Sequence, residues 1–187
     1  MSQTFRPALV LFVLFSLLLG VAYPLAMTGI GQAFFPNAAN GSPIVREGQV
    51  VGSTLIGQSF TREDYFWGRP SAAGDGYNAR SSSGANLGPT SQALADRIAA
   101  EAERYGVPAS DIPADLLTTS GSGLDPHISP AAAYFQAERV AGARGVSIES
   151  VRQLIVTHTE APFAGILGEP RVNVLQLNLA LDELSQG

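Results

Sequence analysis

Residues 118–129 read TTSGSGLDPHIS, and this stretch marks where a loop gives way to a helix. Glycine loses more backbone freedom on folding than any other residue, so the Ser-Gly-Ser-Gly run predicts a shaped loop rather than a helix or strand. The Asp125-Pro126 step favours an extended or turn conformation. Ser129-Pro130 then predicts a helix start, with Ser129 as N-cap and Pro130 at the first helical position.

Such a loop presents backbone amides that can bind an anion or a carbonyl group of a partner. The candidate partner or ligand loop comprises Ser120, Gly121, Ser122, Gly123, Asp125 and His127. The alternative is a structural turn between two helices, because a glycine-rich loop alone is weak evidence for a ligand.

The N-terminal region predicts a membrane anchor. Residues 8–30 carry no charge and are mostly apolar, and about 20 such residues cross a bilayer as a helix. Arg6 precedes this span and the next basic residue is Arg46, so the positive-inside rule predicts a cytoplasmic N-terminus at residues 1–7. A linker over 31–48 then leads to an extracytoplasmic domain over 49–187, which is periplasmic if an outer membrane exists.

Two alternatives to the anchor are a cleaved signal peptide and a buried soluble helix. The candidate cleavage site at Pro24-Leu25-Ala26 is poor, because proline stands where a small residue is wanted. A buried helix is disfavoured because only Ser16 interrupts the apolar residues from 8 to 19. We therefore predict a single-pass protein of the cell (inner) membrane.

Composition excludes several kinds of chemistry. The chain has no cysteine, and all 11 of its basic residues are arginines. Without lysine it has no Walker-type phosphate ligand, no Schiff-base lysine and no Ser-Lys dyad. The formal net charge is −5 and no basic cluster is present, so nucleic acid is not an expected partner.

Beyond the linker, the pattern predicts an α+β domain with few strands. Residues 49–60 are β-branched and apolar with glycine breaks, which predicts one or two strands, and residues 61–88 predict mostly loop. Apolar residues at helical spacing between start and stop signals predict four helices. These helices cover 91–105, 130–144, 148–159 and 174–185. The last region has an alternative, an edge strand over 171–179.

Two further loops are candidate interface segments. Residues 65–70, YFWGRP, contain Trp67 and Arg69, which are residue types enriched at protein interfaces. The alternative, equally supported, is a small hydrophobic plug that seals the domain. Asn86 lies in a second donor-rich loop, residues 83–89, whose alternative role is to cap the following helix.

The sequence assigns no catalytic residue and no metal site. A metal would need His127 and His158 together with a carboxylate, and His158 lies on the apolar face of its predicted helix, which favours a satisfied boundary histidine. Ser122 with Asp125 and His127 is the only candidate for a Ser-His-Asp hydrolase, and it lacks the G-x-S-x-G turn.

Several segments together resemble one protein family. They follow the N-terminal anchor in this order: GSTLIGQSF at 52–60, YFWGRPSA at 65–72, SGANLGPT at 83–90, SGSGLDPHISPAAA at 120–133, QAERVAGARG at 136–145 and PRVNVLQLNLAL at 170–181. Their order and spacing resemble the C subunit of the Kdp-type bacterial potassium-transporting P-type ATPase, over nearly the whole chain.

This resemblance implies a non-catalytic accessory subunit of an ATP-driven potassium uptake complex. The implied partners are a potassium-channel-like pore subunit, a P-type ATP-hydrolysing subunit and a small single-helix subunit. ATP is then a ligand of the complex and potassium the transported ion. The resemblance also implies a role in assembly, and a proposed role as a catalytic chaperone that raises the ATP affinity of the pump subunit. The alternatives are a membrane-anchored periplasmic hydrolase and a binding protein.

The predicted topology restricts how this chain acts on ATP. An extracytoplasmic domain cannot contact cytoplasmic nucleotide, so any effect on ATP affinity must be allosteric. The hypothesis that follows is a domain at the extracellular entrance of the pore subunit, with Trp67, Arg69, Asn86 and residues 120–127 near its contacts.

Overall fold

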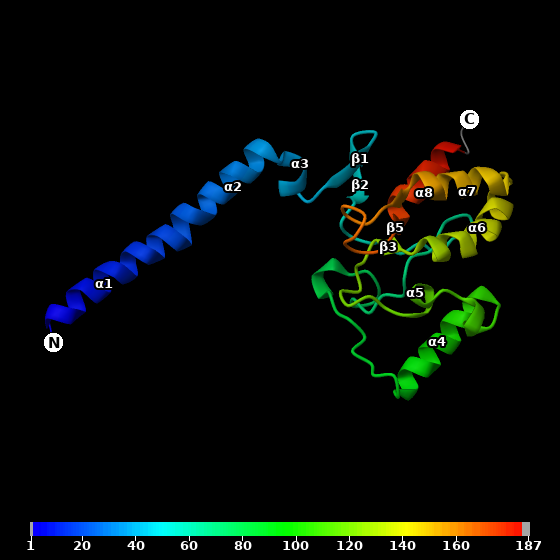
Figure 1. Cartoon of the computed structure of the whole chain (residues 1–187), viewed down its shortest axis with the longest axis horizontal. Helices are drawn as coiled ribbons and strands as arrows, with labels where there is room; N and C mark the ends of the chain where they lie inside the picture. Colours follow the sequence, from blue (N-terminus) through cyan, green and yellow to red (C-terminus); the bar gives the residue numbers. More distant parts are fainter. Residues whose placement is uncertain (1, 185–187) are drawn as a thin grey trace. The chain divides into compact units, whose positions relative to one another are not determined.

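The computed structural model describes residues 2–184 and divides into two compact units, Met1–Val51 and Gly52–Gly187 (Figure 1). The architecture is mixed helix and strand, as the sequence predicts. The C-terminal end of the helix predicted over 174–185 includes Ser185, which lies outside the described residues.

The first unit is built on one long apolar helix. It comprises α1 (Ser2–Leu17), a π-helical turn η1 (Leu18–Ala22) and α2 (Tyr23–Phe34). Residues Thr4–Phe34 form a candidate membrane span with a mean hydropathy of 2.5, and none of its most apolar window is buried within the chain. The candidate span predicted from the sequence is therefore present, and its helix continues to Phe34.

The π-helical turn has a local cause. Proline has no N–H, so Pro24 cannot donate a hydrogen bond to the preceding turn of the helix. The Tyr23 N–H donates to the carbonyl of Leu18, five residues earlier. This wider turn accommodates the missing donor of Pro24 without ending the helix.

A short helix α3 (Pro36–Ala39) and a two-stranded sheet follow the long helix. The sheet pairs β1 (Pro43–Arg46) with β2 (Gln49–Ser53). Glu47 and Gly48 connect the strands and both have positive φ, 51° and 77°, which is the geometry of a two-residue hairpin turn. β2 is the one strand within the region 49–60, where the sequence predicts one or two.

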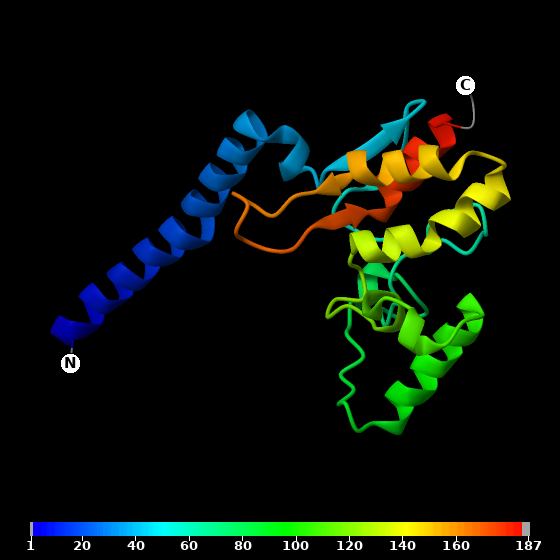
Figure 2. The same cartoon turned by 45° about the vertical axis from the view of Figure 1, so that its right-hand side comes forward.

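The second unit contains a three-stranded antiparallel sheet in the order β3-β5-β4. β3 is His127–Ile128, β4 is Thr159–Glu160 and β5 is Arg171–Asn173. The central β5 pairs Val172 with both Ile128 and Thr159. Three helices pack beside this sheet (Figure 2). They are α6 (Pro130–Arg144), α7 (Ile148–Thr157) and α8 (Val174–Leu184).

The remaining helices precede the sheet in the sequence. They are η2 (Ala79–Ser81), α4 (Gln92–Tyr105), η3 (Ala109–Asp111) and α5 (Ala114–Leu117). The predicted helices at 91–105 and 130–144 are confirmed, together with their end signals. Ser129 Oγ accepts a hydrogen bond from the Ala132 N–H at 3.0 Å, and Gly106 and Gly145 end their helices in the left-handed conformation.

The edge strand predicted as an alternative over 171–179 is wrong in extent and in position. Only Arg171–Asn173 is extended, and it forms the centre of the sheet rather than its edge. Asn173 Oδ1 accepts from the Gln176 N–H at 3.1 Å, so this residue caps α8 and turns the chain from strand to helix.

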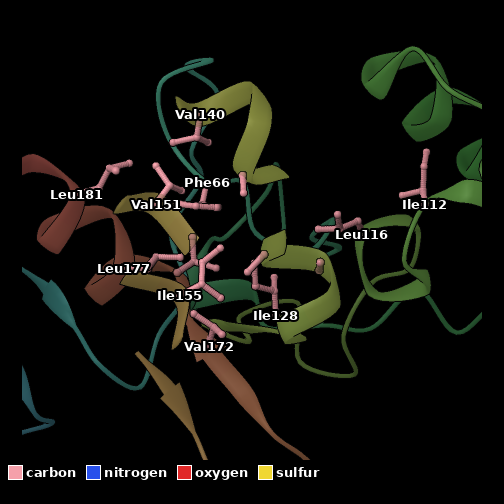
Figure 3. Packing of buried hydrophobic residues seen from close by; sticks show 14 of the residues in the cluster. Phe66, Ile112, Leu116, Ile128, Val140, Val151, Ile155, Val172, Leu177 and Leu181 are labelled. Atoms are coloured by element: carbon pink, nitrogen blue, oxygen red, sulfur yellow. The ribbon is translucent and has the colours of Figure 1, made fainter. Parts of the chain in front are cut away.

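One hydrophobic core holds the second unit together (Figure 3). Its fully buried side chains come mainly from β5 and the three C-terminal helices, and they include Val140, Val151, Ile155, Val172, Leu177 and Leu181. Phe66, from the long irregular segment before α4, is also fully buried in this core. The predicted loop over 61–88 therefore carries part of the core although it has little regular structure.

Candidate functional site

The loop at 118–129 folds by pairing its serine side chains with its own backbone. Ser120 Oγ accepts from the Gly123 N–H at 2.9 Å, and Ser122 Oγ accepts from the Leu124 N–H at 3.1 Å. Gly123 has a φ of 67°, and a Cβ at this position would lie 2.6 Å from the Ser83 carbonyl oxygen. Ser120 is buried, so its hydroxyl shapes the loop instead of facing solvent.

The second predicted loop, residues 83–89, lies against the first. The Ser83 N–H and the Ser82 hydroxyl both donate to the Ser122 carbonyl oxygen, at 3.0 and 2.9 Å. A Cβ on Gly84 would lie 2.8 Å from the Gly121 carbonyl oxygen, so the two backbones touch. The fold therefore joins two loops that the sequence predicted separately.

These two loops and Leu94 of α4 line an open pocket of about 260 Å³. Asn86 is exposed on its wall with a φ of 52°, in the left-handed region that asparagine tolerates better than most residues. The lining residues are Gly84, Ala85, Asn86, Leu87, Leu94, Thr118, Thr119, Ser120 and Gly121.

Arg69 connects the third predicted segment to the same loop. Its guanidinium donates to the carbonyl oxygens of Thr118 and Thr119, and Nη1 lies 3.3 Å from Asp125 Oδ2. The side chains of Arg69 and Asp125 are 24% and 30% exposed, so the pair lies at the boundary between core and solvent. Its role in the chain is to hold the two ends of the candidate loop.

Asp125 also orders the residue that follows Pro126. Its Oδ1 accepts from the His127 N–H at 3.0 Å and lies 3.2 Å from His127 Nδ1. Burial opposes ionisation of Asp125, but the hydrogen bonds from His127 and the charge of Arg69 outweigh it and hold the pKa of this carboxyl below its usual value. Asp125 is therefore an ionised structural bridge at neutral pH.

A polar pocket of about 310 Å³ opens beside this bridge. It brings together candidate residues and charged residues that no sequence pattern had indicated. The lining comprises Arg69, Asp115, Asp125, His127, Ile128, Ser129, Glu169, Pro170 and Arg171. Asp115 in this pocket already accepts from the backbone N–H and the hydroxyl of Ser129, at 2.6 and 3.2 Å, so it caps the start of α6.

Trp67 lies in the interior, with 3% of its surface exposed. Its ring is stacked between the guanidinium groups of Arg104 and Arg139, each 3.8 Å from the ring centroid, and its Nε1 donates to the Arg62 carbonyl oxygen. The structure thus gives Trp67 the plug role that the sequence left open, because a buried ring offers no surface to a partner. Arg69 and Asn86 are the candidate interface residues with accessible surface.

The candidate hydrolase residues are close in sequence but only two of them are in contact. Asp125 contacts His127, while the Ser122 hydroxyl accepts from Leu124. His158 caps the end of α7, where its Nδ1 lies 3.0 Å from the Leu154 carbonyl oxygen. Within residues 2–184, no group of three His, Asp or Glu side chains is placed to hold a metal ion.

Sequence reasoning missed the residues that hold the irregular segment in the core. Gln136 on α6 accepts from the Trp67 N–H at 2.8 Å and donates to the Trp67 carbonyl oxygen at 3.1 Å. Its side chain is 1% exposed. The available signal was an amide residue on the apolar face of a predicted helix, since buried polar groups are almost always hydrogen-bonded.

The two units together fit a single-pass membrane protein: one candidate membrane span, followed by a helix/strand domain whose polar loops are ordered by internal hydrogen bonds. The chain matches the family described as K+-transporting ATPase, c chain, over residues 5–183, and it belongs to that family.

Relatives match over nearly their whole length. The potassium-transporting ATPase KdpC subunit of Polaromonas naphthalenivorans is 57% identical over 189 residues, which cover 98% of this chain and 96% of that protein. The corresponding subunit of Caulobacter vibrioides (strain NA1000 / CB15N) is 58% identical over 186 residues, covering 97% and 94%. That of Rhodospirillum rubrum is 57% identical over 187 residues, covering 98% and 97%.

Proposed function

We propose that this chain is a non-catalytic accessory subunit that stabilises the assembly of a potassium-channel-like pore subunit with a P-type ATP-hydrolysing subunit. The observation that carries the proposal is the family match over residues 5–183, which includes both the candidate membrane span and the folded domain. A small single-helix subunit completes the proposed complex. Because the chain has no lysine, it lacks the Asp-Lys-Thr-Gly phosphorylation motif of P-type pumps.

The geometry of the candidate loops supports a docking role over a nucleotide-binding role. The Gly123 and Leu124 N–H groups are used by Ser120 and Ser122, so fewer amides remain to bind a phosphate. Arg69 also holds the loop, because its guanidinium donates to the carbonyl oxygens of Thr118 and Thr119. A loop ordered in advance loses little conformational entropy when it binds a partner.

ATP and potassium belong to the complex in this proposal, as the hydrolysed nucleotide and the transported ion. With the domain outside the cytoplasm, a catalytic-chaperone effect on ATP affinity passes through the anchor helix or the partner subunits as an allosteric coupling. The domain lies beside the extracellular entrance of the pore subunit, with Arg69, Asn86 and residues 120–127 near the contact.

The proposed topology can be tested cleanly because the chain contains no cysteine. Thr4→Cys lies at the start of the span and Glu103→Cys on an exposed face of α4. In intact cells stripped of any outer membrane, a membrane-impermeant maleimide should label Glu103→Cys at once and Thr4→Cys only after permeabilisation. The reverse pattern would place the folded domain in the cytoplasm.

The proposed assembly role is tested by affinity purification of the tagged chain from gently solubilised membranes. We expect two much larger membrane proteins in the eluate, together with potassium-stimulated ATPase activity. Arg69→Gln should reduce their recovery, whereas Arg80→Gln, at an exposed position on η2, should not. Recovery of the wild-type chain alone from cells grown in low potassium would exclude the role. A Ser122→Ala variant with an unchanged phenotype removes the hydrolase alternative.

A further inference from the structure

The connection between β4 and β5 presents an apolar tip to solvent. It runs through residues 161–170, APFAGILGEP, and projects beyond the ends of the two strands (Figure 2). Ile166 is 81% exposed, Phe163 77% and Leu167 62%. Ile166 and Phe163 are the most exposed large hydrophobic side chains among the residues whose burial the structure describes. We call residues 162–167 the apolar loop.

Hydrogen bonds within the apolar loop hold its shape. The N–H of Phe163 donates to the Leu167 carbonyl oxygen at 2.9 Å, and the N–H of Leu167 donates back to the Phe163 carbonyl oxygen at 3.0 Å. The Gly165 N–H donates to the Pro162 carbonyl oxygen, also at 2.9 Å. Ala164 and Gly165 both have positive φ, 52° and 75°. The loop is therefore a closed turn that directs its apolar side chains outward.

Folding of this chain does not account for that exposure. The neighbouring strand residue Val172 is fully buried, so the sheet already has its hydrophobic partners on the core side. A cluster of exposed apolar side chains on an ordered loop marks a surface that another molecule covers.

The charges around the apolar loop indicate what that molecule is. Residues 161–168 carry no charge, and the loop is bounded by Glu160 and Glu169. Glu160 is paired with Arg171 at 2.9 Å, and Glu169 lines the polar pocket together with Arg171. Loops and helices that insert into lipid usually add basic residues, which anionic headgroups attract, whereas carboxylates are repelled there. An apolar recess in a protein, with basic residues at its rim, complements this pattern.

We propose that the apolar loop inserts into such a recess on a membrane-embedded partner subunit of the transport complex, with Glu169 facing a basic group at the rim. This proposal rests on the proposed function, because it assigns a contact within that complex. It adds a hydrophobic anchor on the β4–β5 connection to the candidate loops at 83–89 and 118–129, and Glu169 lines the polar pocket beside Asp125 and His127. Lipid insertion and self-association of the chain are the competing outcomes.

A photo-crosslinking residue at the loop tip tests the contact directly. Phe163→p-benzoylphenylalanine keeps an aromatic side chain, and Tyr134, a 43% exposed aromatic on α6, provides the matched control position. Irradiation of the intact complex in membranes should join position 163, and not position 134, to one of the larger subunits. A lipid adduct, a dimer of this chain, or no adduct at position 163 would overturn the proposal.

Substitutions measure how much the contact contributes. The double variant Phe163→Ser/Ile166→Ser should lower the apparent affinity for the partner subunits by at least about tenfold, as loss of central apolar contacts does at protein interfaces. Val156→Ser is the control, because Val156 is 55% exposed on α7. Glu169→Arg should weaken assembly, and Glu138→Arg, at an exposed position on α6, should not.

Recovery of the partner subunits by the wild type and by the double variant distinguishes a failure of this proposal from a failure of the proposed function. Failure of the wild-type chain to recover partner subunits contradicts the proposed function itself. Recovery by the wild type and equally by the double variant contradicts only the assignment of the apolar loop. An unchanged melting temperature of the double variant shows that a loss of assembly reflects the lost contact, because these side chains are outside the core.

Discussion

Asn178 and Phe66 are joined by two hydrogen bonds although 112 residues separate them. The Asn178 side chain, 1% exposed on α8, accepts from the Phe66 N–H at 2.8 Å and donates to the Phe66 carbonyl oxygen at 3.0 Å. Gln136 on α6 makes the equivalent pair of bonds to Trp67. The two amide side chains thus take the place of neighbouring strands and let irregular backbone enter the core.

Asn178→Ala should destabilise the domain by about 2–5 kcal/mol, because it leaves both buried backbone groups of Phe66 without partners. Unfolding of the full chain by urea in mild detergent can be followed by the fluorescence of Trp67, the only tryptophan. Gln153→Ala, at an exposed position on α7, should change stability by no more than about 0.5 kcal/mol. Equal midpoints for the two variants would show that the amide pairing contributes nothing.

Trp67→Ala should reduce stability by about 3–5 kcal/mol, since it removes a buried aromatic ring and the stacking of two guanidinium groups on it. The expected phenotype is loss of folded protein, measured by thermal melting with circular dichroism. Tyr134→Ala, on the exposed face of α6, is the control and should melt close to the wild type. A Trp67→Ala chain with wild-type stability but no partner binding would instead restore Trp67 as an interface residue.

Gly123→Ala and Gly142→Ala should have opposite effects. A Cβ at Gly123 would lie 2.6 Å from the Ser83 carbonyl oxygen and 2.7 Å from the Ala73 nitrogen, at a positive φ. The Gly123→Ala variant should lower the free energy of unfolding by about 1–3 kcal/mol, because the added Cβ strains the contact between the two loops. A Cβ at Gly142 in α6 would meet nothing within 4 Å beyond the backbone of its own helix. Alanine there should therefore raise the free energy of unfolding by about 0.5–1 kcal/mol, because alanine loses less backbone freedom in a helix than glycine does. The melting temperature should fall below that of the wild type for Gly123→Ala and rise above it for Gly142→Ala.

Asp125 should contribute to the loss of stability in acid. Its pKa is lowered in the folded chain, so its stabilising effect is present above the unfolded value of about 3.9 and is lost as the pH falls through the folded value. Asp125→Asn should therefore flatten this part of the profile between about pH 5 and pH 2. At pH 7 it should cost under about 1 kcal/mol, because the carboxylate is partly exposed to solvent.

The check is the melting temperature of the full chain measured against pH. Asp75→Asn, at an exposed position before η2, serves as the matched removal of one carboxylate. If the Asp125→Asn and wild-type profiles were parallel throughout the acid range, the bridge to His127 and Arg69 would have no energetic role.

Sequence patterns predicted the features that depend on neighbouring residues. The uncharged run at 8–30 predicted the candidate span, because crossing a bilayer depends on local length and hydrophobicity. Ser129-Pro130 and Gly145 predicted the bounds of α6, because caps act within one turn of a helix. The strand at 171–173 was harder to predict, since a short strand is stabilised by partners that lie far away in the sequence.

By itself, the sequence determined the candidate membrane span, the main helices and the resemblance to a family, because each is encoded in contiguous residues. Only the tertiary structure decided that Trp67 is buried while Arg69 reaches Asp125, although Trp67 and Arg69 are near neighbours in one loop. It also decided that Phe163 and Ile166 are exposed, whereas Val172 on the adjoining strand is buried. Burial depends on which distant segments pack against a residue, and amino-acid type alone does not specify that packing.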